Sequence, residues 1–313
     1  MKCQYSRTIL VLPVAVLMGC TSALAGKSTG SFEQALAVDT PVQIDVRTGS
    51  GSISVQQGQA DQVEVFGTIV VNRGAGLFSH STEDAEELIR QVKANPPVQY
   101  ADGRLRIGHI ENPKLRKNVS LSYRITVPFD TQIRSHTGSG SQDLAGISGP
   151  ADASTGSGDL TFTDISGAVE ARTGSGSIRA EGISGDFMAN TGSGGVRLDQ
   201  AGPGDVDARS GSGQIVLRGI NGALRADSGS GGIEVEGRQT GPWELDTGSG
   251  SVRISLPGDA AFELDAESNS GDIDIDHPIT VQGMISEDRL KGEVRGGGAL
   301  LRVRTGSGDI RIK

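Results

Sequence analysis

Apolar residues along most of this chain come in pairs spaced by two, with a polar residue between them. Leu160 and Phe162 form one such pair, and Ile178 and Ala180 form a later one. Residues spaced by two lie on the same face of a β-strand. The residues between them are mostly polar or charged, so each run predicts a short strand with one buried face and one solvated face.

A glycine-rich phrase separates these runs at regular intervals. Thr-Gly-Ser-Gly or a near variant begins at ten positions, which are Thr48, Thr137, Thr155, Thr173, Thr191, Ser210, Ser228, Thr247, Ser268 and Thr305. From Thr137 to Thr247 the interval is always 18 or 19 residues, and each interval holds two apolar pairs. Such a period predicts a stack of similar coils. The expected fold is all-β, a parallel β-solenoid of about 18 residues and two strands per coil.

Glycines mark both corners of each predicted coil. The second corner reads Gly-Ile-Ser-Gly or a relative at 146–149, 182–185 and 219–222, with 164–167 as a looser copy. Glycine at fixed offsets predicts backbone positions with positive φ at these corners. The Thr or Ser that opens each phrase predicts a ladder of hydrogen-bonded hydroxyls along one edge of the rod.

Residues 38–135 hold the first repeat and a region with a different pattern. Its predicted elements are a strand at 62–71, a helix that begins at 81–84 and ends at 95–97, a hairpin joining 98–100 to 105–107, and a strand at 119–127. We interpret this region as a cap of strands and one helix that covers the open N-terminal end of the array. A ligand site built from the loops 73–80 and 108–117 is the alternative.

The repeat array at 136–313 becomes irregular near its end. From Ser268 to Thr305 the interval is 37 residues, which corresponds to two periods with the phrase between them lost. The sequence therefore predicts that the C-terminal end packs under the loop 278–292 or pairs end to end with another molecule. We expect the charges of Arg311 and Lys313 to keep other strands from pairing with that exposed edge.

The first 25 residues have the pattern of a targeting segment. Lys2 and Arg7 precede a short apolar run that ends at Met18 and is too short to span a membrane. Leu17-Met18-Gly19-Cys20 then resembles the lipobox of bacterial lipoproteins. This predicts a signal peptide at 1–19, lipidation of Cys20 and a tether at 20–37, with ordinary cleavage after Ala25 as the alternative.

Cysteine content agrees with export. Cys3 and Cys20 are the only cysteines, so the mature chain contains one or none and no disulfide. The expected location is the bacterial cell envelope, with the protein anchored to a membrane by its lipid. In a cell with two membranes, this means the outer membrane or the periplasm.

Charge and residue spacing exclude several kinds of site. The formal net charge is −9, and Lys and Arg are mixed with Asp and Glu, which argues against nucleic-acid binding. The four histidines, His80, His109, His136 and His277, lack metal-ligand spacing. Calcium-binding repeats carry an Asp at a fixed position after their glycines. In this chain that position is apolar, as at Ile178. We therefore predict no metal site, no cofactor and no catalytic residues.

Further motifs accompany the repeats. The Val127-Pro128 pair stands before the array, and the chain closes on Thr-Gly-Ser-Gly-Asp-Ile-Arg-Ile at 305–312. Together with the two kinds of corner, these features resemble the bacterial putative-adhesin β-solenoid family, a domain of unknown function with TGSG repeats. The likeness covers roughly residues 40–313. It implies a secreted or envelope protein with a parallel β-solenoid, and it brings no catalytic residues with it.

Two classes of function remain. The first is a non-enzymatic cell-envelope protein, a rigid adhesin-like scaffold that binds an envelope glycan or a protein. The alternative is a carbohydrate-active enzyme, a polysaccharide lyase or hydrolase on a β-helix. Such an enzyme would use acid and base side chains in a groove, often with aromatic platforms for sugars. The aromatic residues Phe162, Phe187, Trp243 and Phe262 stand at inward positions instead, which favours the scaffold.

Overall fold

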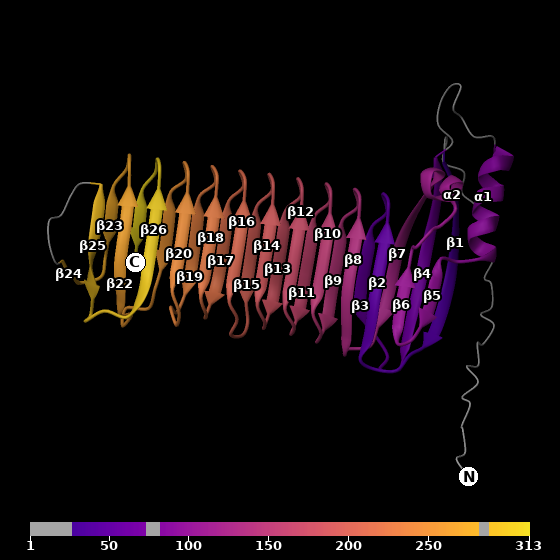
Figure 1. The fold of residues 1–313 in the computed structure, drawn as a ribbon, viewed down its shortest axis with the longest axis horizontal. Coiled ribbons are helices and arrows are strands. Elements are labelled where there is room, and N and C mark those ends of the chain that lie inside the picture. The colour runs from indigo at the N-terminus through magenta and orange to yellow at the C-terminus, as the bar shows by residue number, and fades with distance from the viewer. Residues whose placement is uncertain (1–26, 73–81, 282–287) are drawn as a thin grey trace, which may run out of the picture.

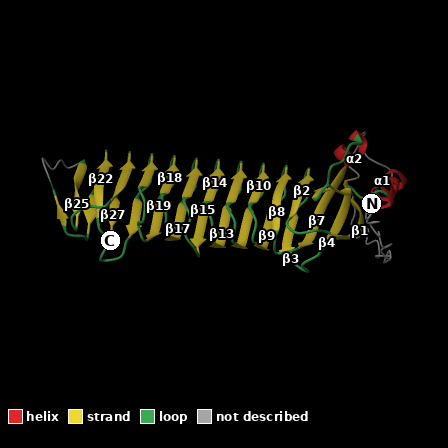
Figure 2. Cartoon of the chain, turned by 60° about the horizontal axis from the view of Figure 1, so that its bottom comes forward, coloured by secondary structure: helices red, strands yellow, loops and turns green. Residues whose placement is uncertain are grey.

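Two long β-sheets face each other along a rod, with both helices at one end (Figures 1 and 2). The computed structural model of the protein describes residues 27–72, 82–281 and 288–313. The predicted signal peptide, Cys20 and the cleavage site after Ala25 therefore lie outside the described residues. The all-β solenoid predicted from the repeats is confirmed.

The chain alternates between the two sheets. Sheet A contains, in spatial order, β1 (Lys27–Ala37), β4 (Gln62–Asn72), β7 (Val119–Val127), β3 (Ile53–Gln57), β9 (Gln142–Ile147), β11 (Leu160–Ile165), β13 (Ile178–Ile183), β15 (Val196–Gln200), β17 (Ile215–Ile220), β19 (Ile233–Gly237), β21 (Val252–Ser255), β27 (Ile310–Ile312) and β23 (Ile273–Ile275). Sheet B contains, in spatial order, β24 (Ile279–Thr280), β25 (Arg289–Val294), β22 (Phe262–Ser268), β26 (Ala299–Thr305), β20 (Trp243–Thr247), β18 (Leu224–Ser228), β16 (Val206–Ser210), β14 (Phe187–Thr191), β12 (Val169–Thr173), β10 (Ala151–Thr155), β8 (Thr131–Thr137), β2 (Val42–Thr48), β6 (Arg104–Ile107) and β5 (Val98–Ala101). The helices of the described residues are α1 (Thr82–Ala94) and α2 (Pro113–Asn118).

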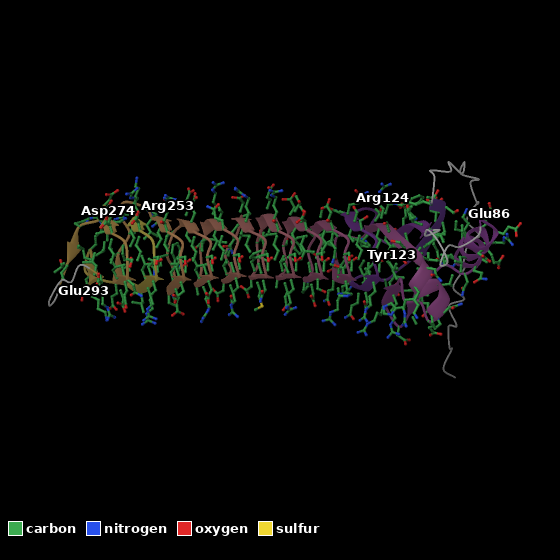
Figure 3. All side chains as sticks on the ribbon, turned by 90° about the horizontal axis from the view of Figure 1, so that it is seen from above. Glu86, Tyr123, Arg124, Arg253, Asp274 and Glu293 are labelled. Carbon is green, nitrogen blue, oxygen red and sulfur yellow. The ribbon has the colours of Figure 1, made fainter. Side chains whose placement is uncertain are left out.

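Each coil contributes one strand to each sheet, and equivalent strands pair in parallel and in register. Leu160 of β11 stands opposite Ile178 of β13, for example, and Val169 of β12 stands opposite Phe187 of β14. The inward apolar residues of the coils from β8 to β21 are buried, and Trp243 is among the largest fully buried side chains. Figure 3 shows the same alternation, with side chains filling the space between the sheets and projecting from both outer faces. The predicted inside and outside of the coil are thus confirmed.

The corners differ from the prediction in one respect. Positive φ occurs at the second corner, at Gly146, Gly182 and Gly219, and at Asp164 in the looser copy. The glycines of the Thr-Gly-Ser-Gly corners do not have positive φ, except Gly271 in the corner that begins at Ser268. They are needed there because each coil's backbone passes too close to the next for a side chain to fit.

The hydroxyls at the first corner also form a different network from the one expected. Thr173 Oγ1 donates to the carbonyl oxygen of Gly158 in the preceding coil at 2.9 Å. The same oxygen accepts from the N–H of Gly176 in its own corner at 3.1 Å. The pattern repeats from Thr137 to Thr247, with Ser210 and Ser228 in equivalent roles. The hydroxyls therefore connect through peptide groups and not to one another.

Thr173→Val is expected to lower the free energy of unfolding by about 1–3 kcal/mol. Valine has nearly the same shape but leaves the Gly158 carbonyl and the Gly176 N–H without their hydroxyl partner. Thr173→Ser keeps the hydroxyl and should cost less. Urea denaturation of both variants measures the difference. Equal losses for the two variants would mean that the threonine methyl group, and not the hydroxyl, stabilises the corner.

The N-terminal region caps the rod as predicted. The helix α1 packs on β1 and β4 through one face that carries Ala85, Ile89 and Val92, all of which are buried. The predicted hairpin is present as β5 and β6, and the strands predicted at 62–71 and 119–127 are β4 and β7. The short helix α2, within the loop at 108–117 and one residue beyond it, was not predicted. The loop 73–80 lies outside the described residues.

The predicted tether differs from the structure. Lys27–Ala37, which the sequence analysis assigned to the tether, forms β1 and pairs antiparallel with β4 over its whole length. Its composition is small and polar, which suggests a linker, but its alternation places Phe32 in the core. Only residues 20–26 remain for a tether, and they lie outside the described residues.

The terminal coils do not stack in chain order. The first coil, β2 and β3, lies between the coil of β6 and β7 and the coil of β8 and β9. At the other end, β26 and β27 lie between the coil of β20 and β21 and the coil of β22 and β23. Figure 1 shows this insertion as the yellow strand β26 between the orange strands β20 and β22.

This arrangement corrects the expectation for the C-terminus. No coil is lost between Ser268 and Thr305, because the chain turns back through β24 and β25 and inserts its last coil inside the stack. Arg311 therefore lies on an inner strand and not on an exposed edge, and it pairs with Asp274 at 3.4 Å. The Lys313 N–H donates to Ile254 of β21. The outermost strands at this end are β23 and β24, and end-to-end association through them stays a prediction.

Candidate binding site

A groove of about 830 Å³ runs along the outer face of sheet B, from β2 to β20. Its floor is formed by the first residues of successive strands, such as Ala151 and Val169. Two rows of side chains flank this floor. In each strand, the residue before an inward position and the residue after it both lie on the outer face. The groove crosses the coils at right angles to the strands, so it follows the axis of the rod.

The two rows differ in character. The row before the inward positions begins with Arg104, Gln43 and Gln132 at the capped end. It continues with small or acidic residues, which are Pro150, Ala168, Asp186, Asp205, Ala223 and Pro242. The row after the inward position carries most of the charge and consists of Asp45, Arg134, Asp152, Glu170, Met188, Asp207, Arg225 and Glu244. The small residues leave room for a ligand beside the charged row.

Ion pairs hold the charged row in place. Arg134 bonds to Asp152 of the next coil at 3.0 Å, and Arg225 lies 3.6 Å from Glu244 of the next coil. Arg209 pairs with Asp207 within one strand at 2.7 Å. The arginines are exposed and the carboxylates are partly exposed, so each pair adds little stability. Their effect is to fix the positions of charged groups that face the groove.

The acidic residues of the first row are bound to the backbone. Asp186 Oδ1 accepts from the Asp205 N–H at 2.9 Å, and Asp205 Oδ1 accepts from the Ala223 N–H at 2.9 Å. The second oxygen of each carboxylate makes no hydrogen bond within the described part of the chain. Each of these residues therefore offers one fixed acceptor to a ligand in the groove.

The middle of the groove combines these acceptors with an exposed apolar group. Met188 on β14 is 47% exposed and lies between Glu170 and Asp207 in the charged row. Exposed large apolar side chains are rare among the described residues of this protein, which makes Met188 notable. Acceptors beside an apolar contact are suited to a ligand with both hydroxyl groups and apolar faces.

Two carboxyl groups beyond the groove have shifted acidity. Burial and the neighbouring Asp227 carboxylate raise the pKa of Asp246 on β20. Burial alone would raise the pKa of Asp265 on β22, but hydrogen bonds and charges from Arg289 and Lys291 hold this pKa below its ordinary value. Asp265 thus fixes β22 to β25 at the end of the rod, and neither residue lines the groove.

The three described histidines lie in different parts of the fold. His109 Nε2 lies 3.6 Å from Asp45, and His136 Nδ1 lies 3.0 Å from the Ser154 hydroxyl. His277 is buried and its ring packs edge-on against Phe262. His80 lies outside the described residues. Within the described ranges, no three His, Cys, Asp or Glu side chains are grouped to hold a metal ion.

The groove itself was missed by the sequence analysis, although a signal for it was present. Residues 18 or 19 apart become lateral neighbours in this fold, so Arg134 and Asp152 are predictable partners. The row of Pro150, Ala168 and Ala223 repeats small residues at the same step.

Among the described residues, no helix has the length and apolar content needed to cross a membrane.

Solved structures that resemble this chain include three bacterial proteins. A putative cell adhesion protein from Clostridium sporogenes is 12% identical and aligns over 91% of this chain and 99% of its own, with a TM-score of 0.21. A putative adhesin from Bacteroides fragilis is 12% identical over 91% of this chain and 97% of its own, with a TM-score of 0.36. A putative lipid binding protein from Parabacteroides distasonis is 15% identical over 90% of this chain and 97% of its own, with a TM-score of 0.44.

Similarity at this distance assigns no ligand and no activity to the chain. No curated protein matches the sequence. Residues 124–313, which are most of the coils and the last strand of the cap, match the sequence profile named Toastrack DUF4097. The chain therefore belongs to the Toastrack DUF4097 family, in agreement with the predicted likeness to putative-adhesin β-solenoids.

Proposed function

We propose that this protein is an exported, non-enzymatic binding scaffold of the bacterial envelope that holds an elongated ligand in the groove on sheet B. The observation that carries the proposal is the continuity of the groove over successive coils. Strands in one sheet are about 4.8 Å apart, so similar groups recur along the groove at a constant step. A repeating polymer such as a glycan matches a surface of this kind.

The charge of the groove favours a neutral or cationic ligand. Its lining contains seven acidic residues and three arginines. Carboxylates accept hydrogen bonds from sugar hydroxyls, and the arginines at Arg134 and Arg225 donate to ring or hydroxyl oxygens. A polymer with many negative charges would be repelled by most of this surface.

The acidity of the carboxyl groups supports binding over hydrolysis. A glycosidase needs a carboxylic acid with a raised pKa beside the bond that it cleaves. Asp246, whose pKa is raised, does not line the groove. The groove residues Asp152 and Asp207 are instead held in ion pairs with Arg134 and Arg209.

Ala168→Trp tests the groove directly. The indole would fill the groove beside β12 without disturbing the core, because Ala168 is exposed. We expect the purified protein to retain polysaccharide extracted from the bacterial envelope, and Ala168→Trp to weaken this retention at least tenfold. Thr163→Trp, on the outer face of sheet A, is the matched control and should bind as the wild type does.

The same incubation shows whether the protein only binds the polysaccharide or also cleaves it. A binding scaffold leaves the number of reducing ends and the absorbance of unsaturated sugars unchanged. Release of such products, abolished by changing one groove carboxylate to its amide, would establish the enzyme instead. Equal retention by the wild type and Ala168→Trp would mean that the polysaccharide does not bind in the groove.

The lipobox supports attachment to a membrane, and the length of the linker limits how far the coils would lie from it. Six residues separate Cys20 from β1, and a chain of this length reaches at most about 25 Å when extended. A lipid on Cys20 would hold the capped end near the membrane, with the coils and their groove extending beyond it. Cys20→Ala should move the protein from the membrane fraction to the soluble fraction. Unchanged fractionation would favour cleavage after Ala25.

A further inference from the structure

A second hollow, of about 360 Å³, lies on the outer face of sheet A across β11, β13, β15 and β17. It is open because Gly195 contributes no side chain to the row before the strands. The groups around it are mainly hydrogen-bond donors. They are the guanidinium groups of Arg179 and Arg197, the hydroxyls of Thr161 and Ser177, and the amide of Gln214.

The two arginines stand side by side. Arg179 of β13 and Arg197 of β15 are opposite each other in the parallel register, so their backbones are about 4.8 Å apart. Like charges directly opposite each other in a sheet are destabilising. Neither guanidinium makes a hydrogen bond or an ion pair with any other described residue.

Several other outward arginines of this protein pair with a carboxylate, although Arg253 and Arg304 have no ion-pair partner within 4.0 Å among the described residues. Arg253 and Arg311 also stand opposite each other, on β21 and β27, but Arg311 lies 3.4 Å from Asp274. Arg253 and Asp274 project together from this outer face in Figure 3. On sheet B, Arg134 and Arg209 each contact a carboxylate. Two arginines that stand opposite each other, with no carboxylate partner for either, occur among the described residues at this hollow and not at Arg253 and Arg311.

Three carboxylates near the hollow do not neutralise the pair. Asp159 uses Oδ1 to accept from the Ser177 N–H at 2.8 Å. Glu181 and Asp199 follow two residues after Arg179 and Arg197, and they too stand opposite each other. No ion pair within 4.0 Å connects any of these carboxylates to the two arginines among the described residues.

We propose that this hollow binds one oxyanion, a sulfate, phosphate or carboxylate group carried by an envelope molecule. Guanidinium groups bind such anions through paired hydrogen bonds, and two of them can share the oxygens of one anion. The hydroxyl of Ser177 and the amide of Gln214 add neutral donors. The bound anion also removes the repulsion between the arginines.

The affinity for a single small anion is expected to be in the millimolar range. The formal net charge of the chain is −9, so the protein as a whole does not attract anions over long distances. Recognition at the hollow depends on local contacts. The site is independent of the groove on sheet B, which lies on the opposite face and has more acidic than basic residues in its lining.

Side-chain NMR of the mature protein tests this proposal. The Nε–Hε signals of the arginines are followed while sodium sulfate or sodium phosphate replaces sodium chloride at constant ionic strength. We expect saturable shifts of Arg179 and Arg197 with one shared dissociation constant. Arg253 lies on the same face outside the hollow and should shift weakly and without saturation. Equal, non-saturating shifts of all three would overturn the proposal.

Substitutions distinguish anion binding at the hollow from a general effect of net charge. Arg179→Ala should abolish the saturable shift of Arg197 and leave the melting temperature unchanged, because the side chain is exposed. Arg253→Ala removes the same charge and should leave anion binding intact. If Arg253→Ala weakens binding as much as Arg179→Ala does, net charge alone explains the effect and the proposal is wrong.

The neighbouring carboxylates supply a further test. Glu181→Gln with Asp199→Asn should tighten anion binding by no more than about threefold. Binding that appears only in this double variant would mean that the carboxylates occupy the arginines in solution, which would overturn the proposal. Once small anions bind, the carrier is identified by comparing dextran sulfate, polygalacturonate and vesicles that contain phosphatidylglycerol.

Discussion

Gly176→Ala is expected to unfold the middle of the rod. A Cβ on Gly176 would lie 1.9 Å from the carbonyl oxygen of Gly158 in the preceding coil and 2.5 Å from its carbon. Both are backbone atoms within paired coils, so they cannot move without separating the strands. We expect a loss of more than about 4 kcal/mol in the free energy of unfolding, measured by urea denaturation with circular dichroism.

Gly49→Ala and Gly174→Ala form a matched control pair, because both residues are the first glycine of their phrase. A Cβ at Gly174 would lie 2.4 Å from the carbonyl oxygen of Gly156, whereas a Cβ at Gly49 has no atom within 4 Å. Substitution of Gly49 should change the free energy of unfolding by no more than about 0.5 kcal/mol, less than substitution of Gly174. If both variants lose the same stability, the phrase would require glycine for its own conformation and not for the approach of the next coil.

These glycines show which part of the fold can be predicted from the sequence. The coil was predictable because its signals are local, with apolar residues spaced by two and corners spaced by 18 or 19. The reason for glycine at the first corner was not local. Gly176 has an ordinary φ, and the contact that excludes a side chain comes from Gly158, one full coil earlier.

The order of the coils could not be predicted for a related reason. Every coil presents the same register to its neighbours, so Thr247 can stand opposite either Ser268 or Thr305. The interval of 37 residues between the last two phrases fits a missing coil as well as a chain that turns back. The structure places Thr305 between the other two, and the repeat pattern contains no signal for this choice.

The candidate site was predictable only in part. The outward charges were evident, and partners such as Arg134 and Asp152 follow from the period once neighbouring coils are aligned. The unpaired state of Arg179 and Arg197 was not evident, because Glu181 and Asp199 are close enough in sequence to suggest ion pairs. Their separation depends on side-chain positions that the pattern does not encode.

Ile310→Asp is expected to be far more destabilising than Ile273→Asp, and this comparison tests the inserted coil. Both residues are isoleucines at the same register position of sheet A, and they stand opposite each other on β27 and β23. Ile310 is fully buried between Val252 and Ile273, whereas Ile273 is partly exposed on the outermost strand. A carboxylate at Ile310 would be buried without a partner and should cost more than about 4 kcal/mol.

Stacking in chain order predicts the opposite ranking. In that order β27 would be the outermost strand, so aspartate at Ile310 would remain solvated, while aspartate at Ile273 would be buried inside the stack. Thermal melts of the two variants distinguish these arrangements without a ligand. Trp243, the only tryptophan, adds a local signal because it lies on β20 directly beside β26. Separation of the inserted coil should expose its indole and shift its emission to longer wavelength, which Ile310→Asp should cause and Ile273→Asp should not.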